Sequence, residues 1–180
     1  GALAAGGNRW RRKQFEPFLT TAMHHIDACY FWRWAQAGET PQAYGLRMAN
    51  QLEEKILELG EDSVAAFIAE PIVASAGGGL VPPPEYFPII RKACDKYDIV
   101  FIMDEIVTGF GRTGKNMAME HFGVVPDIVT FAKGVSSGYA PLAGMAVRDE
   151  MAATFKETGA EFQHLYTFSA HPIACAVGNE

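Results

Sequence analysis

The sequence lacks a long hydrophobic run and lacks an excess of basic residues. It holds 15 Lys and Arg against 21 Asp and Glu, which gives a formal net charge of −6 at pH 7. A membrane-spanning helix needs roughly 18 consecutive apolar residues. A surface for nucleic acid or for an anionic membrane needs a basic field. We therefore expect a protein that binds neither membranes nor nucleic acids.

Cysteine is scarce and is not spaced for a disulfide framework or a zinc site. The chain has three of them: Cys29, Cys94 and Cys175. An odd number of distant cysteines, without a recognisable leader segment, favours free thiols in the cytoplasm. His24, His25 and Asp27 lie close to Cys29, but no second cluster with metal-ligand spacing accompanies them. We interpret them as surface or packed residues and predict no metal site.

The overall composition is that of an ordinary globular domain, with 49% hydrophobic and 20% charged residues over 180 positions. That length suits one domain with its own core. The chain begins at Gly1 instead of Met and stops at Glu180 inside an expected helix. We therefore interpret residues 1–180 as part of a single domain that is truncated at both ends.

Apolar patterning predicts helices that alternate with short buried strands. Helices are expected at 41–59, 86–97, 116–122, from Asp149 onward and at 171–180, and strands at 64–68, 99–103, 128–131 and 142–147. Residues 1–20 are expected to be irregular, and 21–38 suggest no definite element. Because the strands are apolar throughout, the pattern predicts an α/β domain whose mostly parallel sheet is flanked by helices on both faces.

Charged residues follow three of the expected strands. Glu70 follows the first, Asp104 and Glu105 follow the second, and Lys133 follows the third. Ligands of open α/β sheets bind beyond the carboxyl ends of the strands. A desolvated lysine is a nucleophile toward aldehydes, and pyridoxal phosphate needs such a lysine together with a carboxylate at its ring nitrogen. From spacing alone, solvated strand ends remain an equal alternative.

Four motifs strongly resemble those of the class III aminotransferase family. They are Ala-Glu-Pro-Ile at 69–72, Asp-Glu-Ile-Val-Thr-Gly-Phe-Gly-Arg-Thr-Gly at 104–114, Phe-Ala-Lys-Gly at 131–134 and Tyr-Thr-Phe-Ser-Ala-His-Pro at 166–172. The resemblance implies part of the large domain of the fold-type I enzymes, with pyridoxal 5′-phosphate as cofactor. It is weaker over the first 40 residues.

The resemblance also implies a role for each matching residue. Lys133 forms the Schiff base and moves the proton, and Asp104 pairs with the ring nitrogen. Ile106 packs against the ring, and Glu70 lies near the reacting centre. Thr167 reaches the cofactor phosphate of the partner subunit, which implies a homodimer.

Two departures from the family pattern bear on the substrate. Val107 stands where several family branches carry a glutamine that contacts the cofactor's phenolic oxygen. Ser75 stands where the ornithine and 4-aminobutyrate branches carry glutamate. The pattern resembles the branch that moves an amino group from an ω-amino acid or amine to an oxo acid such as pyruvate. An aminomutase, racemase or decarboxylase of the same family is the alternative.

A nucleotide-binding module is a further alternative from another class. Residues 109–116 nearly match a phosphate-binding Walker A loop, but Asn116 replaces the Ser or Thr that holds magnesium.

The family's glycine-serine phosphate loop and its substrate arginine lie outside the matching motifs. We therefore expect the isolated 180 residues to bind the cofactor weakly or not at all.

Overall fold

Two units of structure are distinguished in the computed structural model, which describes residues 1–180. The first unit contains residues 1–68 and 72–99, and the second contains residues 69–71 and 100–180. The assignment of residues 1–180 to one partial domain remains a prediction.

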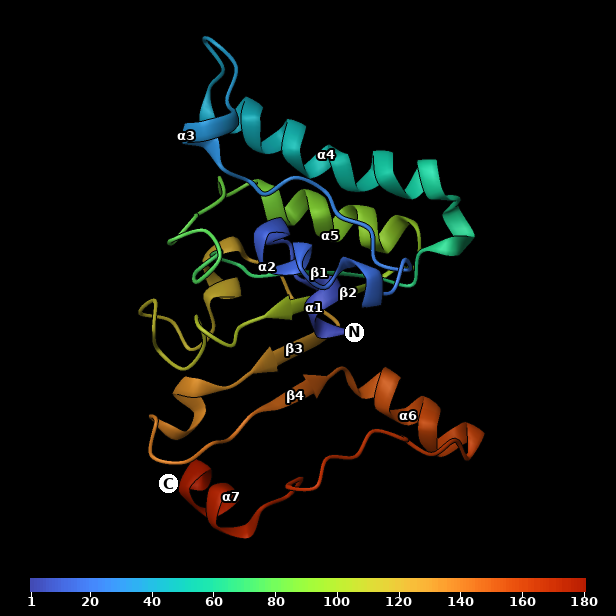
Figure 1. The fold of residues 1–180 in the computed structure, drawn as a ribbon, viewed down its shortest axis with the longest axis vertical. Coiled ribbons are helices and arrows are strands. Elements are labelled where there is room, and N and C mark those ends of the chain that lie inside the picture. The colour runs from blue at the N-terminus through green and yellow to red at the C-terminus, as the bar shows by residue number, and fades with distance from the viewer. The chain divides into compact units, whose positions relative to one another are not determined.

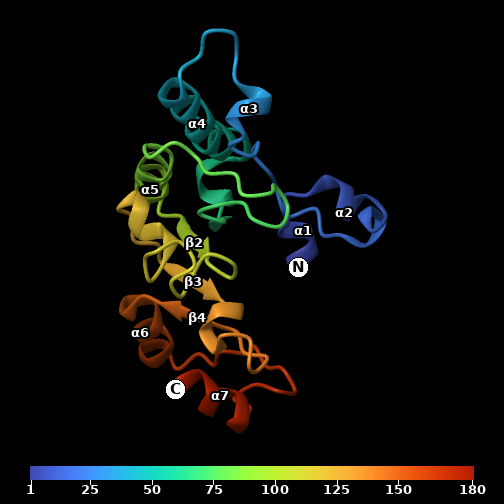
Figure 2. The ribbon, with the colours of Figure 1, turned by 90° about the vertical axis from the view of Figure 1, so that its left-hand side faces the viewer.

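Two helices, α4 (Pro41–Leu59) and α5 (Tyr86–Lys96), lie side by side in the first unit (Figures 1 and 2). Thr40 caps α4, because its Oγ1 accepts a hydrogen bond of 3.2 Å from Ala43 N. Pro41 occupies the first turn, and Gly60 ends the helix with φ at 98°. Both predicted bounds of this helix are therefore confirmed.

The core of the first unit is formed by the facing sides of these two helices. Its buried members include Tyr44, Met48, Leu52 and Ile56 of α4 and Phe87, Ile90, Ala93 and Cys94 of α5. The spacing of three and four residues is the helical pattern that the sequence shows. At Gly45 the helix closely approaches the proline run at 82–84, since a Cβ there would lie 2.9 Å from Pro83.

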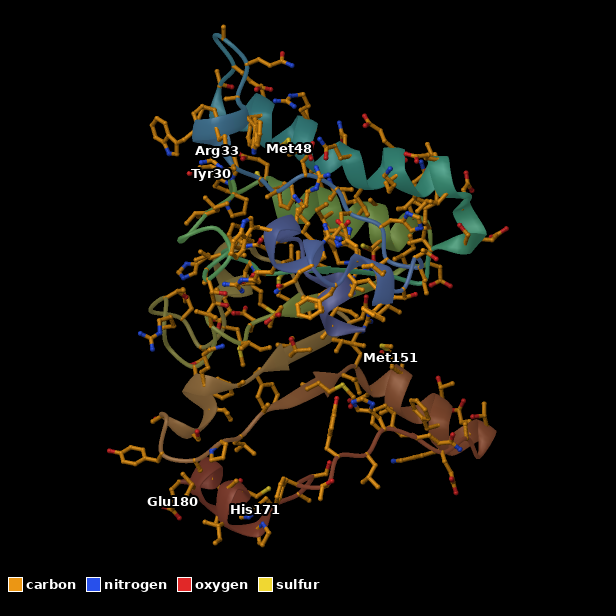
Figure 3. The ribbon with its side chains drawn as sticks, in the orientation of Figure 1. Tyr30, Arg33, Met48, Met151, His171 and Glu180 are labelled. Atoms are coloured by element: carbon orange, nitrogen blue, oxygen red, sulfur yellow. The ribbon has the colours of Figure 1, made fainter.

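The first 40 residues contain short helices that sequence patterning did not predict. They are α1 (Ala2–Ala5), α2 (Arg9–Lys13), the 3-10 helix η1 (Glu16–Phe18) and α3 (Phe31–Trp34). Asn8 caps α2 by accepting from Arg11 N at 3.2 Å. Figure 3 labels Tyr30 and Arg33 at α3, where the Arg33 guanidinium lies 5.0 Å from the Tyr30 ring centroid. One-turn helices are too short to show an apolar period.

The sheet has four strands in the order β1-β2-β3-β4 and is mostly parallel, as predicted. The strands are β1 (Ala66–Ala69), β2 (Val100–Asp104), β3 (Ile128–Phe131) and β4 (Gly144–Val147). β2 and β3 are parallel, with Asp104 opposite Thr130 in the register. β4 runs antiparallel to β3, with Gly144 opposite Phe131. The first and last strands start two residues later than predicted.

The expectation that every strand is covered on both faces is wrong for two of them. All four residues of β4 are exposed, and β1 alternates between exposed and half-buried residues. β4 packs chiefly against β3 (Figure 1). An apolar run predicts burial only where a covering layer is present, and the run itself does not encode that layer.

The remaining elements are short. They are the 3-10 helices η2 (Glu61–Ser63), η3 (Ala118–Phe122) and η4 (Lys133–Ser136), and helices α6 (Asp149–Thr158) and α7 (Pro172–Asn179). The helix predicted at 116–122 is thus a 3-10 turn. Arg148, not Asp149, holds the cap position of α6, and Asp149 lies in the first turn. His171 caps α7 by accepting from Ala174 N at 3.3 Å (Figure 3).

Candidate functional site

The second unit brings the predicted acid and the predicted amine to one edge of the sheet. Asp104 is the last residue of β2, and Lys133 follows the end of β3 by two residues. Because β2 and β3 are parallel neighbours, their carboxyl ends lie at the same edge. This is the edge at which open α/β sheets bind ligands. Thr130, three residues before Lys133, is the register partner of Asp104.

Lys133 has an unusual backbone conformation. Its φ is 49°, in the left-handed region, and it is the first residue of η4. That region costs a residue with a Cβ about 1 kcal/mol or more. Strained residues of this kind cluster at functional sites. Helix α7 packs against η4, and a Cβ at Gly178 would overlap the Leu142 side chain. The turn that carries Lys133 therefore packs closely against helix α7.

The half-buried carboxylate of Asp104 is only partly occupied. Its Oδ1 accepts a hydrogen bond of 3.0 Å from Ile106 N, an Asx turn that bends the chain away from β2. The 180 residues provide no other hydrogen-bond donor to this carboxylate. On the adjacent strand, the Thr130 Oγ1 is buried without any hydrogen-bond partner. The buried Thr130 hydroxyl and the half-buried Asp104 carboxylate therefore stand at facing positions of neighbouring strands.

Glu105 has a structural role that sequence reasoning missed. Its side chain is fully buried, and its carboxylate accepts from the Thr108 hydroxyl, from Ala118 N at 3.0 Å and from Met119 N at 2.7 Å. Asp104 and Glu105 follow each other in an extended segment, so their side chains leave it on opposite sides. That alternation is the signal that separates a ligand-facing acid from an internal anchor.

The loops after β2 and β3 touch each other. A Cβ at Gly134 would lie 3.0 Å from Phe110 Cβ and 3.2 Å from Gly109 O. The Phe110 and Phe131 rings meet edge to face, with centroids 5.5 Å apart. Gly134 lets the lysine turn approach the glycine loop because it has no side chain. The position of Lys133 is thereby tied to the loop that Glu105 anchors.

The other predicted site residues lie in loops and turns of the second unit. Ile106 and Val107 are half-buried at the start of the glycine loop. Glu70 is half-buried and belongs to the short segment Ala69–Pro71, which groups with the second unit. Thr167 is exposed and lies in a turn that is fixed by a hydrogen bond of 3.1 Å from Tyr166 N to Ser169 Oγ. Its position leaves its side chain accessible to another molecule.

The hydrogen bonds of the glycine loop disfavour the nucleotide-binding alternative. Phe110 N donates to Asn116 O at 2.7 Å, and Gly114 N donates to Gly111 O at 3.1 Å. In a phosphate-binding loop such N–H groups point at the ligand. Here they are used within the loop, and a 3-10 helix follows in place of an α-helix.

The side chains near Cys29 have partners other than a metal. Asp27 accepts from Gln51 Nε2 at 3.2 Å, and His25 lies 3.1 Å from an Arg12 guanidinium nitrogen. Burial raises the pKa of the Cys29 thiol to about 12, which opposes a thiolate ligand. No group of three or more His, Cys, Asp or Glu residues lies close enough to hold a metal ion.

No helix of the chain combines the length and apolar character of a membrane span.

The residues of the sheet edge fit the ring of pyridoxal phosphate. A carboxylate with an unoccupied oxygen suits a protonated ring nitrogen, and an exposed lysine amine suits the aldehyde. The Thr130 hydroxyl lacks the partner that a buried polar atom normally has. For the cofactor phosphate, the resemblance supplies Thr167 alone.

Comparisons with known proteins agree with this geometry. The putrescine–pyruvate aminotransferase of Pseudomonas aeruginosa is 49% identical over 179 residues, which are 99% of this chain and 38% of that protein. Gamma aminobutyrate transaminase 3 of Solanum lycopersicum is 42% identical over 159 residues, which are 87% of this chain and 30% of that protein. The chain therefore spans well under half the length of these relatives.

Solved structures show the same fold. The (S)-enantioselective omega-transaminase of Thermomicrobium roseum matches with a TM-score of 0.92 and 44% identity, covering 99% of this chain and 39% of that one. An omega-transaminase of Pseudomonas jessenii in complex with PMP matches with a TM-score of 0.89 and 37% identity, covering 99% of this chain and 40% of that one. Class III aminotransferases use pyridoxal phosphate, and the Pseudomonas jessenii structure holds PMP. The model of the family described as "Aminotransferase class-III" matches residues 1–180. The chain belongs to that family.

Proposed function

We propose that the full-length protein is a pyridoxal-phosphate-dependent transaminase that moves an amino group from an ω-amino acid or amine to an oxo acid such as pyruvate. The observation that carries the proposal is the parallel pairing of β2 and β3, which sets Asp104 and Lys133 at one edge. The family membership and the names of the relatives support the same reaction class.

Lys133 is the proposed catalytic residue. Its exposed amine would attach the cofactor through the aldehyde and then carry a proton between the substrate carbon and the cofactor. When bound, the cofactor supplies an electron-accepting ring that stabilises the charge released at the substrate carbon. The strained turn at Lys133 is consistent with a functional role for that residue.

Asp104 is the proposed partner of the ring nitrogen. Its carboxylate would accept a hydrogen bond from the protonated nitrogen and so keep the ring positively charged. Ile106 and Val107 would contact the ring and its phenolic side with apolar groups. Glu70 would lie near the reacting atoms and orient the groups around them.

The Thr167 hydroxyl would donate a hydrogen bond to the cofactor phosphate of a second copy. The proposed enzyme is therefore a homodimer. The exposed turn that carries Thr167 is consistent with such a contact. Gel filtration combined with light scattering tests the dimer.

We further propose a cytoplasmic location, supported by three free cysteines. Cell fractionation tests it, since named relatives include chloroplastic and mitochondrial proteins.

The proposed donor class depends on position 75. Ser75 is exposed in the turn after β1 and carries no charge for a mobile arginine. A panel of amino donors and oxo acids, tested with the purified full-length enzyme, distinguishes the branches. Amines or ω-amino acids with pyruvate are the expected substrates. A strict preference for ornithine with 2-oxoglutarate would contradict the proposal.

Absorbance spectroscopy with matched variants tests the chemistry itself. The wild-type protein is expected to show a visible cofactor band that an amino donor bleaches and an oxo acid restores. Lys133→Ala should lose the band, and Lys115→Ala, an exposed lysine of the glycine loop, should keep it. Release of CO2, or a rearranged or racemised product without an oxo acid, would favour the decarboxylase, aminomutase or racemase alternatives.

A further inference from the structure

Thr130 carries a buried polar atom that the fold does not use. Its Oγ1 is shielded from solvent and has no hydrogen-bond partner. Buried hydroxyls are nearly always satisfied, because an unpaired one loses its bonds to water without replacement. A valine would fill the same shape on this apolar strand without that cost. The hydroxyl of Thr130 therefore has no structural benefit within these residues.

Asp104 lies beside Thr130 on the adjacent strand. Thr130 and Asp104 are register partners of two parallel strands, and Glu105 N donates to Thr130 O at 2.9 Å beside them. Partners in a parallel pair point to the same face of the sheet. Ile106 N occupies one oxygen of Asp104, and no residue occupies the other. A spare donor thus lies on the strand beside a spare acceptor.

We propose that Thr130 is a positioning residue, whose hydroxyl donates to the Asp104 carboxylate when the cofactor ring is bound. The inference rests on the proposed function. A carboxylate that meets a ring nitrogen through one contact can rotate about its own bond. A second donor on the neighbouring strand, together with Ile106 N, fixes the plane of the carboxylate and therefore the direction of its free lone pair.

A positioning role and a structural role predict different stabilities without cofactor. Because the hydroxyl is unpaired in this fold, Thr130→Val should leave the melting temperature of the cofactor-free enzyme unchanged or raise it. The same variant should weaken pyridoxal phosphate binding about tenfold, since a charge-assisted hydrogen bond is lost. Thr130→Ser, which keeps the hydroxyl, should restore most of the affinity.

The experiment measures cofactor affinity and melting temperature on the full-length protein, before and after pyridoxal phosphate is added. Thr154→Val is the control, because the Thr154 hydroxyl bonds only within its own exposed helix. Unchanged cofactor affinity in Thr130→Val, or an equal loss of melting temperature with and without cofactor, would overturn the inference. Wild-type protein that binds no pyridoxal phosphate would instead overturn the proposed function.

Discussion

Glu105 accepts a hydrogen bond of 2.7 Å from the backbone N–H of Met119, which lies fourteen residues later in the chain. This contact closes the loop that begins at Ile106 and holds its far end against the sheet. The adjacent Asp104 is left with an oxygen for a ligand. One acid of the pair therefore builds the loop, and the other is available for chemistry.

Loss of the Glu105 carboxylate is expected to destabilise the protein strongly. Glu105→Ala leaves the N–H groups of Ala118 and Met119 and the Thr108 hydroxyl without an acceptor, at a cost of about 3 kcal/mol. Equilibrium urea unfolding measures this free energy. Glu120→Ala removes an exposed acid that bonds only to Met117 N, and should cost about 1 kcal/mol or less. Equal losses in the two variants would contradict the anchoring role.

A methyl group at Gly134 should separate the two loops of the site. The added Cβ would meet Phe110 Cβ at 3.0 Å and Gly109 O at 3.2 Å, so the facing loop has to give by a few tenths of an ångström. We expect a loss of about 1–2 kcal/mol in unfolding free energy together with weaker cofactor binding. Thermal unfolding and a pyridoxal phosphate titration measure the two effects. Gly7→Ala, which meets nothing within 4 Å, is the control and should change neither.

Asp127 joins three strands at the opposite end of the sheet. Its carboxylate accepts from Phe101 N at 2.7 Å and from an Arg148 guanidinium nitrogen at 2.9 Å. Asp127→Ala should cost about 2 kcal/mol, because a buried N–H loses its acceptor. Arg148→Met should cost less than about 1 kcal/mol, since half of the Arg148 side chain is exposed. Urea unfolding that ranks the two variants in reverse would contradict this account.

Acid should selectively weaken the contact between Glu39 and Arg47. The hydrogen bond from the Arg47 side chain, helped by that from Gln36 N, lowers the pKa of the Glu39 carboxyl from 4.5 to about 2. A carboxyl with a depressed pKa adds stability above its ordinary value and loses that stability as the pH falls through the lowered value. The contribution of Glu39 is therefore complete above 4.5 and disappears near 2.

The comparison of wild type with Glu39→Gln isolates this pair. The wild-type melting temperature should exceed that of the variant at neutral pH, and the difference should vanish as the pH approaches 2. A difference that stays constant with pH would show that the charge of Glu39 does not contribute. High salt should reduce the difference, because the Arg47 side chain is partly exposed.

The elements that carry the candidate site could be predicted from the sequence, because their signals are local. The cap of Thr40 and Pro41, the apolar run of β3 and the charged residues after β2 and β3 each depend on neighbouring residues. Parallel pairing then follows from the alternation of strands and helices. The position of Lys133 relative to Asp104 needed only this topology.

Features that depend on distant contacts could not be read from the sequence. The two backbone N–H groups that donate to Glu105 lie thirteen and fourteen residues away in the chain. No local signal in the sequence identifies them. The unsatisfied hydroxyl of Thr130 becomes visible only when every donor around it is placed. The left-handed turn at Lys133 was also unpredictable, because residues with a Cβ seldom adopt it.

Chemical trapping of the cofactor on the full-length enzyme tests the central claim most directly. Borohydride reduction makes the covalent link between the cofactor and its lysine permanent, and peptide mass spectrometry then locates the modified residue. We expect the pyridoxyl group on Lys133 and on no other lysine of the chain. Attachment at another lysine, such as Lys115, or no attachment to a protein that binds the cofactor, would contradict it.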